Sequence, residues 1–355
     1  MKVKSNRKKK LQKLFLIVGG FVIGFVFMEL ILRVYHPFEM RLKGEKIVLP
    51  ILRKYKIHNK TIPKLSENIT HSKNILGFRG DSPPKDFKKY ESIITIGGST
   101  TECFYLSDNE TWSALLEKKL KNDYKNIWLN NAGLDGHSTF GHIILLRDYI
   151  AKMRPKIVIF LVGANDIGRS DLASYDKSMQ KNLNSYWLIE SSEVLSLALN
   201  LYRVWRANNF GVAHQNDVFA ERPRLELSTS VVNASIKKHE LLLDGYANRL
   251  QKIVDLCREY GIKPIFVTQP TVWGNEQLQN VQVSKNVNGR LWQRIVSLYN
   301  AQVLEVANKN DVKLVDLARL MRKDLDYFYD TWHFSKKGAR AVADIIYSHI
   351  VSDVK

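Results

Sequence analysis

The chain has 355 residues, of which 45% are hydrophobic and 25% charged, so it is long enough for one large domain with appendages. Its formal net charge is +19; the first 13 residues hold seven Lys and Arg and no acid, which leaves +12 for the remainder. No nucleic-acid-binding motif accompanies this charge, so we expect no nucleic-acid partner and interpret the excess as a solvated basic surface. The two cysteines lack metal-ligand spacing, which argues against a disulfide scaffold and a zinc site.

A transmembrane signal anchor is predicted near the N-terminus. Residues 1–13 form a basic tail, and residues 14–35 are an apolar stretch long enough to cross a bilayer as a helix. Bulky and charged residues at 27–31 offer no cleavage site, so we expect the anchor to stay uncleaved. The positive-inside rule places the N-terminus in the cytoplasm and the rest of the chain outside it, in a periplasmic or extracellular position. Glu29 is interpreted either as an intramembrane polar site or as a carboxylate that reaches the outer interface beside Arg33.

Strands and helices alternate after the anchor. We expect a juxtamembrane stalk and lead-in over residues 36–90 and a single domain over residues 91–355. The predicted strands cover 92–96, 127–130, 157–162, 264–268 and 312–315, and the predicted helices cover 112–120, 140–153, 247–260, 288–308 and 336–351. This alternation predicts an α/β fold with a parallel sheet covered on both faces. Residues 170–235 exceed a normal connection, and we interpret this insertion as a lid or specificity element.

Polar residues or glycines follow four consecutive strands of the predicted sheet. Ser99 follows the first strand, Gly136 lies in the loop after the second, Asn165 follows the third and Gln269 the fourth. Because loops at the carboxyl ends of parallel strands gather the ligand site, we expect these residues at one rim. The turn-rich segment 76–80 is expected to pack near the same rim.

The same residues belong to four ordered sequence blocks. These are Gly97-Gly98-Ser99, the Gly136 loop, Gly163-Ala164-Asn165-Asp166, and Asp330-Thr331-Trp332-His333. In this order the blocks resemble those of the SGNH or GDSL-type hydrolases, although Gly98-Ser99-Thr100 replaces the Asp-Ser-Leu of the eponymous pattern. The resemblance spans residues 97–333. It implies a three-layer α/β/α flavodoxin-like fold, preceded here by one transmembrane helix, and ester hydrolysis without a cofactor.

Three side chains supply the predicted nucleophilic chemistry. Ser99 needs a neighbouring base to accept its proton, and the imidazole of His333 can do so near neutral pH. Asp330, three residues earlier, can bind the other ring nitrogen and stabilise the imidazolium.

Three donors are predicted for the oxyanion that forms on the ester carbonyl. They are the backbone N–H groups of Ser99 and Gly136 and the side-chain amide of Asn165. Gly133 is the rival of Gly136, because spacing alone does not choose between them, whereas the resemblance favours Gly136. Gln269 is a further candidate for substrate contact.

Each block taken alone has a plainer interpretation. The Gly-Gly-Ser-Thr segment is compatible with an ordinary capped turn, and Asp166 with a helix cap. His137 and His142 are five residues apart with no Glu between them, so we expect no metal site. The joint order of the blocks outweighs these interpretations.

The sequence as a whole therefore predicts a membrane-anchored serine esterase. We expect it to remove O-acyl groups, foremost acetyl, from cell-envelope or exported polysaccharide. One alternative is an O-acyltransferase that passes the same acyl group from serine to a sugar. The other is a catalytically silent glycan-binding or assembly protein that keeps the fold.

Overall fold

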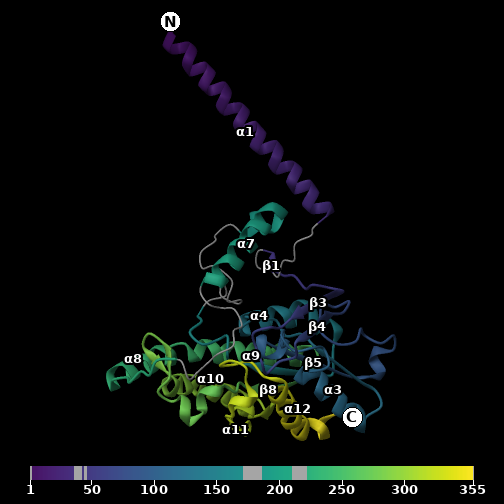
Figure 1. Cartoon of the computed structure of the whole chain (residues 1–355). Helices are drawn as coiled ribbons and strands as arrows, with labels where there is room; N and C mark the ends of the chain where they lie inside the picture. Colours follow the sequence, from purple (N-terminus) through teal and green to yellow (C-terminus); the bar gives the residue numbers. More distant parts are fainter. Residues whose placement is uncertain (1, 36–41, 44–45, 171–185, 210–221, 355) are drawn as a thin grey trace. The chain divides into compact units, whose positions relative to one another are not determined.

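The computed structural model describes residues 2–35, 42–43, 46–170, 186–209 and 222–354. It divides into two compact units. One unit consists of residues 1–50 with 182–211, and the other of residues 51–181 with 212–355. Figure 1 shows the long N-terminal helix of the first unit and the layered α/β core of the second.

A five-stranded parallel sheet forms the centre of the larger unit. In chain order its strands are β5 (Glu91–Gly97), β6 (Ile127–Asn131), β7 (Ile157–Val162), β8 (Lys263–Thr268) and β11 (Lys313–Val315). Their spatial order is β11-β8-β7-β5-β6, and every pairing is parallel. This is the flavodoxin-like order, with β5 and β7 on either side of the point where the order reverses. All six residues of β7 are buried, because helices cover both faces of the sheet.

The helices form two layers on this sheet. In one layer α3 (Trp112–Asp123) packs against α12 (Lys336–Ile350); in the other α9 (Leu243–Glu259) contacts α4 (Thr139–Leu145) and α10 (Gly289–Lys309). Side chains of Thr111, Asn288 and Ser335 cap α3, α10 and α12 by accepting backbone N–H groups of the first turn. The predicted α/β/α fold is confirmed.

The helix predicted at 140–153 contains an irregularity. It starts as α4, widens into a π-helical turn over Leu146–Ile150, and ends with α5 (Ala151–Met153). Arg154 then adopts φ 51°, which stops the helix in a left-handed conformation.

Residues 51–90 belong to the larger unit, whereas the sequence suggested a stalk over 36–90. Strands β3 (Arg53–His58) and β4 (Asn68–Lys73) pair as an antiparallel hairpin. The chain then reaches the sheet, where Arg79 exchanges backbone hydrogen bonds with Asn131 at the end of β6. The compact unit therefore starts about 40 residues before the predicted domain boundary, because polar groups of this segment bind the loops around the sheet.

Shorter elements complete the larger unit. They are α2 (Ser99–Glu102), α8 (Thr229–Glu240), α11 (Leu317–Leu320), β9 (Gln282–Ser284) and β10 (Val287–Asn288), with 3₁₀ turns at Phe87–Lys89, Val272–Gly274, Glu276–Leu278, Leu325–Tyr327 and Val351–Asp353. Of these, α2 carries the predicted nucleophile directly after β5.

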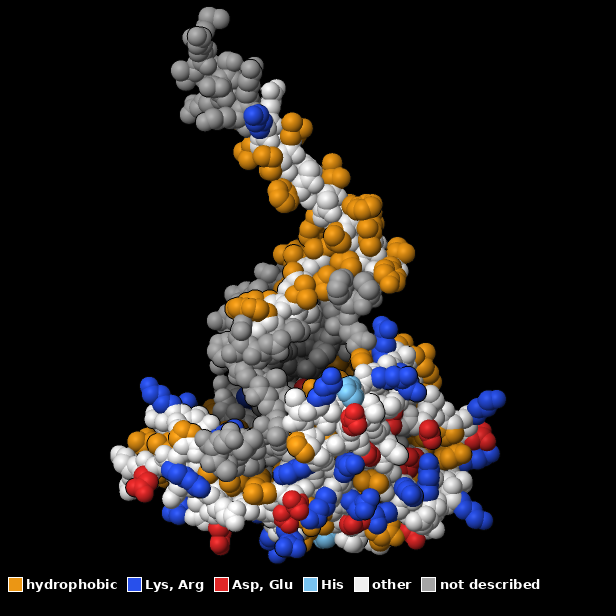
Figure 2. Space-filling model, in the orientation of Figure 1, with side chains coloured by type: hydrophobic (Ala, Val, Ile, Leu, Met, Phe, Trp, Pro, Cys, Tyr) orange, Lys and Arg blue, Asp and Glu red, His pale blue; other side chains and the backbone are white. Residues whose placement is uncertain are grey.

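The smaller unit contains α1 (Lys2–Val34), the pair β1 (Leu42–Lys43) and β2 (Lys46–Ile47), α6 (Tyr186–Ser191) and α7 (Glu193–Asn209). Within α1, the segment Leu11–Val34 is long and apolar enough to cross a membrane. Figure 2 shows hydrophobic side chains along this helix. The predicted insertion at 170–235 includes α6 and α7, while its parts at 171–185 and 210–221 lie outside the described residues, so its role as a lid stays a prediction.

Candidate active site

The predicted nucleophile lies at a tight junction between β5 and α2. Gly97 is the last residue of the strand, and Ser99 is the first residue of the helix. A Cβ atom on Gly97 would lie 2.1 Å from Thr101 Oγ1 and 2.7 Å from the Leu161 carbonyl oxygen. Only glycine fits at this position, and its lack of a side chain allows the chain to pass directly from the strand into the helix. Because Ser99 begins the helix, its backbone N–H has no acceptor within the helix and is available to a ligand.

Ser99, His333 and Asp330 form a continuous hydrogen-bonded chain. Ser99 Oγ lies 2.7 Å from His333 Nε2, and His333 Nδ1 lies 2.5 Å from Asp330 Oδ2. The other oxygen, Asp330 Oδ1, accepts the backbone N–H groups of Trp332 at 2.8 Å and His333 at 2.7 Å. The structure thus brings together residues separated by 231 and 234 positions in the chain, with both ring nitrogens of one imidazole engaged.

The environment of Asp330 keeps its carboxyl group ionised. Burial raises its pKa, but the charge of His333 and the hydrogen bonds from His333 and Trp332 outweigh that effect, so the pKa lies below the ordinary value. The ring of Tyr329 stacks on the imidazole, with centroids 5.5 Å apart and planes 14° from parallel. A carboxylate on one side and an aromatic ring on its face fix the orientation of His333.

The predicted oxyanion donors come from three loops that meet beside Ser99. Gly136 has φ 75°, a left-handed conformation that favours glycine. The side-chain amide of Asn165 donates to the His137 carbonyl oxygen at 3.0 Å, which uses one of its two hydrogens. A Cβ atom on Gly98 would lie only 2.3 Å from Asn165 Nδ2. The Asn165 amide is therefore held against the backbone that precedes Ser99.

Gly133, the rival of Gly136, has a packing role. A Cβ atom there would lie 2.3 Å from the Glu102 backbone nitrogen. Its own backbone N–H donates to Asn131 Oδ1 at 2.8 Å, so that donor is already used inside the protein. This contact favours Gly136 as the oxyanion donor.

Gln269 lies behind the nucleophile. The residue is 1% exposed. Its Oε1 accepts the hydroxyl of Thr100 at 3.0 Å, and its Nε2 donates to the Pro270 carbonyl oxygen at 2.9 Å. These contacts favour a role in supporting α2. Substrate contact by Gln269 stays a prediction.

A buried polar cluster that the sequence reasoning missed joins the Gly136 and Asn165 loops. Asp166 accepts the Thr139 backbone N–H at 3.1 Å, at the start of α4. Arg249 donates through Nη2 to Asp166 at 3.3 Å and through Nε to Thr139 Oγ1 at 2.8 Å, while its guanidinium lies 4.0 Å from the Phe140 ring centroid. Asp166 does cap a helix, but that helix is α4, which lies earlier in the chain. In the sequence, the one sign of this buried cluster was an arginine, Arg249, on the apolar face of α9.

A second cluster holds the other end of α2. Lys73 Nζ binds Glu102 Oε1 at 2.9 Å, and Glu102 Oε2 accepts the Asp135 backbone N–H at 2.6 Å, next to Gly136. Arg79 Nη1 donates to the carbonyl oxygens of Glu102 at 2.8 Å and Cys103 at 2.6 Å. The expectation that segment 76–80 packs near the rim is confirmed by these contacts.

Neither cysteine shares the chemistry of Ser99. Cys103 and Cys257 are both buried, and burial raises the pKa of each thiol to about 12. They remain thiols at neutral pH.

A family comparison matches this arrangement. The model of the GDSL-like lipase/acylhydrolase family matches residues 95–341, which is more than half of the chain. The chain belongs to this family and is an ester-hydrolysing enzyme of the SGNH type. The sequence-based assignment is confirmed.

Individual relatives are more distant. The chain is 27% identical to esterase TesA of Pseudomonas aeruginosa over 190 residues, covering 52% of this chain and 85% of TesA. Among solved structures, it is similar to an acetyl xylan esterase, AlAXEase, at 15% identity and a TM-score of 0.41, covering 72% of this chain and 98% of that one. It is also similar to the acetylxylan esterase Axe2 of Geobacillus stearothermophilus at 16% identity and a TM-score of 0.43, covering 73% and 94%.

Proposed function

We propose that this chain is a membrane-anchored serine esterase that removes O-acetyl groups from cell-envelope or exported polysaccharide. The hydrogen-bonded chain from Ser99 through His333 to Asp330 is the observation that carries the proposal. The glycan substrate is inferred from the anchor, because a domain tethered outside the cytoplasm meets the polymers of the envelope.

Acylation begins with attack of Ser99 Oγ on the ester carbonyl carbon. His333 Nε2 accepts the serine proton, and Asp330 stabilises the resulting imidazolium. The carbonyl oxygen becomes an oxyanion held by the N–H groups of Ser99 and Gly136 and the amide of Asn165. One such donor is typically worth about 3 kcal/mol in the transition state. Collapse of the intermediate breaks the ester C–O bond, and the leaving sugar oxygen takes the proton from His333.

Deacylation repeats the same steps with water. His333 removes a proton from water, whose oxygen attacks the acyl-serine carbonyl carbon, and the second tetrahedral intermediate uses the same donors. Its collapse returns the proton to Ser99 Oγ and releases the acid. The residues therefore complete hydrolysis through acid–base chemistry that they supply themselves.

The anchor defines where this reaction takes place. We assign the basic tail at 1–13 to the cytoplasm, residues 14–35 to a single membrane span, and the esterase unit to the extracytoplasmic side. The 24-residue apolar segment of α1 supports the span.

The test is acetate release from acetylated polysaccharides and from a small chromogenic acetate. We expect turnover by the wild type and a loss of at least ~1000-fold in Ser99→Ala and His333→Ala, because members of a triad act as a unit. Equal rates in wild type and variants would remove the triad assignment. Acetyl groups that appear on a glycan acceptor in place of free acetate would show transfer and contradict hydrolysis.

A further inference from the structure

The last turn of the membrane helix binds the inserted segment at one point. Glu29 and Arg33 are four residues apart on α1 and form an ion pair of 2.9 Å between Glu29 Oε1 and Arg33 Nε. From the sequence, Glu29 is either an intramembrane polar site or a carboxylate at the outer interface. The contacts of its carboxylate in the structure indicate a more specific role, as a helix cap.

This ion pair caps two helices at their junction. The Glu29 carboxylate accepts the backbone N–H groups of Glu193 at 3.0 Å and Val194 at 3.1 Å, at the start of α7. Arg33 Nη2 donates to the Ser191 carbonyl oxygen at 2.7 Å, at the end of α6. Negative charge at a helix N-terminus and positive charge at a helix C-terminus both match the helix dipoles.

The cap fixes the depth at which α7 begins. Glu29 lies five residues before Val34, or roughly 7.5 Å along the helix axis from the end of the apolar segment. Val194 lines an apolar hollow together with Phe25 and Met28 of α1. The first turn of α7 is therefore level with the outer boundary of the hydrocarbon layer when α1 spans a bilayer.

Helix α7 also exposes large apolar side chains. The exposed fractions are 37% for Leu195, 40% for Tyr202 and 62% for Trp205. These positions are spaced by seven and three residues, so they share one face of the helix. Tyrosine and tryptophan are enriched where a protein meets the membrane–water interface.

We propose that α7 is an interfacial helix that lies on the outer leaflet, with Leu195, Tyr202 and Trp205 in contact with lipid. The occupant of this face is the lipid surface, because the Glu29 cap ties its first turn to the membrane span.

The test uses the full-length protein in vesicles of phosphatidylcholine and phosphatidylglycerol. An environment-sensitive dye is attached at Trp205→Cys, and the native thiols interfere little because Cys103 and Cys257 are buried. We expect quenching by nitroxide-labelled lipid at position 205 and none at Lys238→Cys, a matched site exposed on α8. Quenching of the dye at 205 by aqueous iodide but not by labelled lipid would overturn the proposal, as would dye–dye contact showing that a second copy covers this face.

A second variant tests the cap itself. In Glu29→Ala the two N–H groups at the start of α7 lose their acceptor, so lipid quenching at position 205 should fall at least about twofold. Lys13→Ala, at the other end of the span, serves as the control and should leave it unchanged. Equal quenching in the Glu29→Ala protein and its parent would show that the ion pair does not hold α7 at the membrane.

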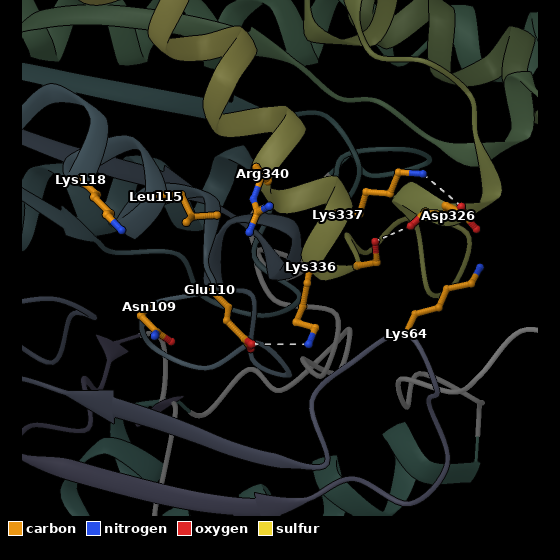
Figure 3. Close-up of a pocket in the computed structure, with 10 residues that line it drawn as sticks. Lys64, Asn109, Glu110, Leu115, Lys118, Asp326, Lys336, Lys337 and Arg340 are labelled. Carbon is orange, nitrogen blue, oxygen red and sulfur yellow. Dashed lines mark hydrogen bonds and ion pairs between the residues drawn. The ribbon is translucent and has the colours of Figure 1, made fainter. Parts of the chain in front are cut away.

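An independent observation concerns a basic groove in the larger unit. A cavity of about 650 Å³ is lined by Lys64, Lys118, Lys336, Lys337 and Arg340 (Figure 3). Two acids, Glu110 and Asp326, also line it, which leaves an excess of three positive charges. We define this cavity as the basic groove.

The acids of the groove are already engaged within the protein. Glu110 accepts the hydroxyl of Ser66 at 2.7 Å, and its ion pair with Lys336 is long at 3.9 Å. Asp326 pairs with Lys337 at 3.1 Å. Within the part of the chain that the structure describes, the side chains of Lys118 and Arg340 form no hydrogen bond or ion pair.

The groove lies beside the catalytic segment. Helix α12, which carries Lys336, Lys337 and Arg340, begins three residues after His333. Helix α3 also lines the groove, through Leu115 and Lys118. Among the residues that the structure describes, no aromatic side chain lines the groove, whereas binding of single-stranded nucleic acid relies on aromatic stacking.

We infer that the basic groove binds the carboxylate or phosphate groups of an anionic polysaccharide. This inference rests on the proposed esterase function for its choice of a glycan. At this place it replaces the sequence-based interpretation of a solvated basic surface, since these five cations line one cavity.

The test measures binding of dextran sulfate to the full-length Ser99→Ala protein, with neutral dextran as the control polymer. Combined Lys118→Glu and Arg340→Glu substitutions should weaken binding by at least ~10-fold. Lys85→Glu with Lys88→Glu, the same charge change at exposed sites outside the groove, should weaken it by less than ~3-fold. Equal losses in the two double variants, or equal affinity for single-stranded DNA, would overturn the inference.

Catalytic assays separate this inference from the proposed function. With Ser99 intact, the groove variant should keep wild-type turnover of the small chromogenic acetate, because Ser99, His333 and Asp330 are not among the residues that line the groove. Loss of dextran sulfate binding with full turnover supports both statements. Absence of turnover in the wild type would contradict the esterase proposal. The dextran sulfate measurements would then still decide whether the groove binds an anionic polymer.

Discussion

At the level of single residues, the ionised state of Asp330 links its proposed catalytic role to the stability of the protein. Its folded-state pKa is depressed, so its contribution to stability is present above the unfolded-state pKa and is lost as the pH falls through the folded-state pKa. In Asp330→Asn the ring loses its anionic partner. We expect a lower Tm than wild type at pH 7, and a difference that narrows below about pH 4. Thermal unfolding of both proteins from pH 7 to 3 measures it, and a gap that widens in acid would contradict the assignment.

Gly98 lies against the side-chain amide of Asn165, the proposed oxyanion donor. In Gly98→Ala the new Cβ atom would meet Asn165 Nδ2 at 2.3 Å and displace the amide. We expect a fall in kcat of about 100- to 1000-fold, comparable to Asn165→Ala, since each removes the same donor. Gly245→Ala on α9, whose Cβ atom would meet no atom closer than 3.5 Å, is the matched control. Wild-type kcat in Gly98→Ala would show that the amide is not a donor.

At the scale of elements, the Asp166–Arg249 pair joins the start of α4, the Asn165 loop and α9. The Asp166 and Arg249 side chains are 1% and 10% exposed, so removal of one partner leaves a buried charge uncompensated. Arg249→Met should lower the free energy of unfolding by about 3–5 kcal/mol. Urea unfolding measures this, with Lys252→Met at an exposed position of the same helix as the control. A change as small as that of the control would show that the cluster is not needed for stability.

The regular elements could be predicted because their periodicity is local. The strand predicted at 157–162 matches β7 residue for residue. A short, wholly apolar run with turn residues on either side is typical of a fully buried strand. The π-helical turn at 146–150 could not be predicted, because one extra residue in a helical turn barely alters the apolar pattern.

The predicted site residues came together, but the residues that hold them did not stand out in the sequence. Arg79, Glu102 and Lys73 look like exposed charges until the hairpin folds against the sheet, since their partners are backbone groups and side chains far along the chain. The same long-range contacts explain why residues 51–90 suggested a stalk. Motif spacing specifies chemistry, while supporting contacts depend on the closed fold.

At the scale of the whole molecule, α1 makes the chain an integral membrane protein in the proposed account. The full-length protein should remain in the membrane fraction after an alkaline carbonate wash, because burial of a 24-residue apolar segment does not depend on salt or pH. A cysteine introduced as Lys309→Cys should react with a membrane-impermeant maleimide on intact cells. Extraction by carbonate would contradict the span, and labelling only after lysis would contradict the orientation.

Covalent labelling of the full-length protein with a fluorophosphonate tests the central claim most directly. If Ser99 is activated by His333 and Asp330, mass spectrometry should find the probe on Ser99 alone, and His333→Ala should slow labelling by at least ~100-fold. A folded wild-type protein that takes up no probe, carries it at another residue, or reacts as fast without His333 would contradict the account.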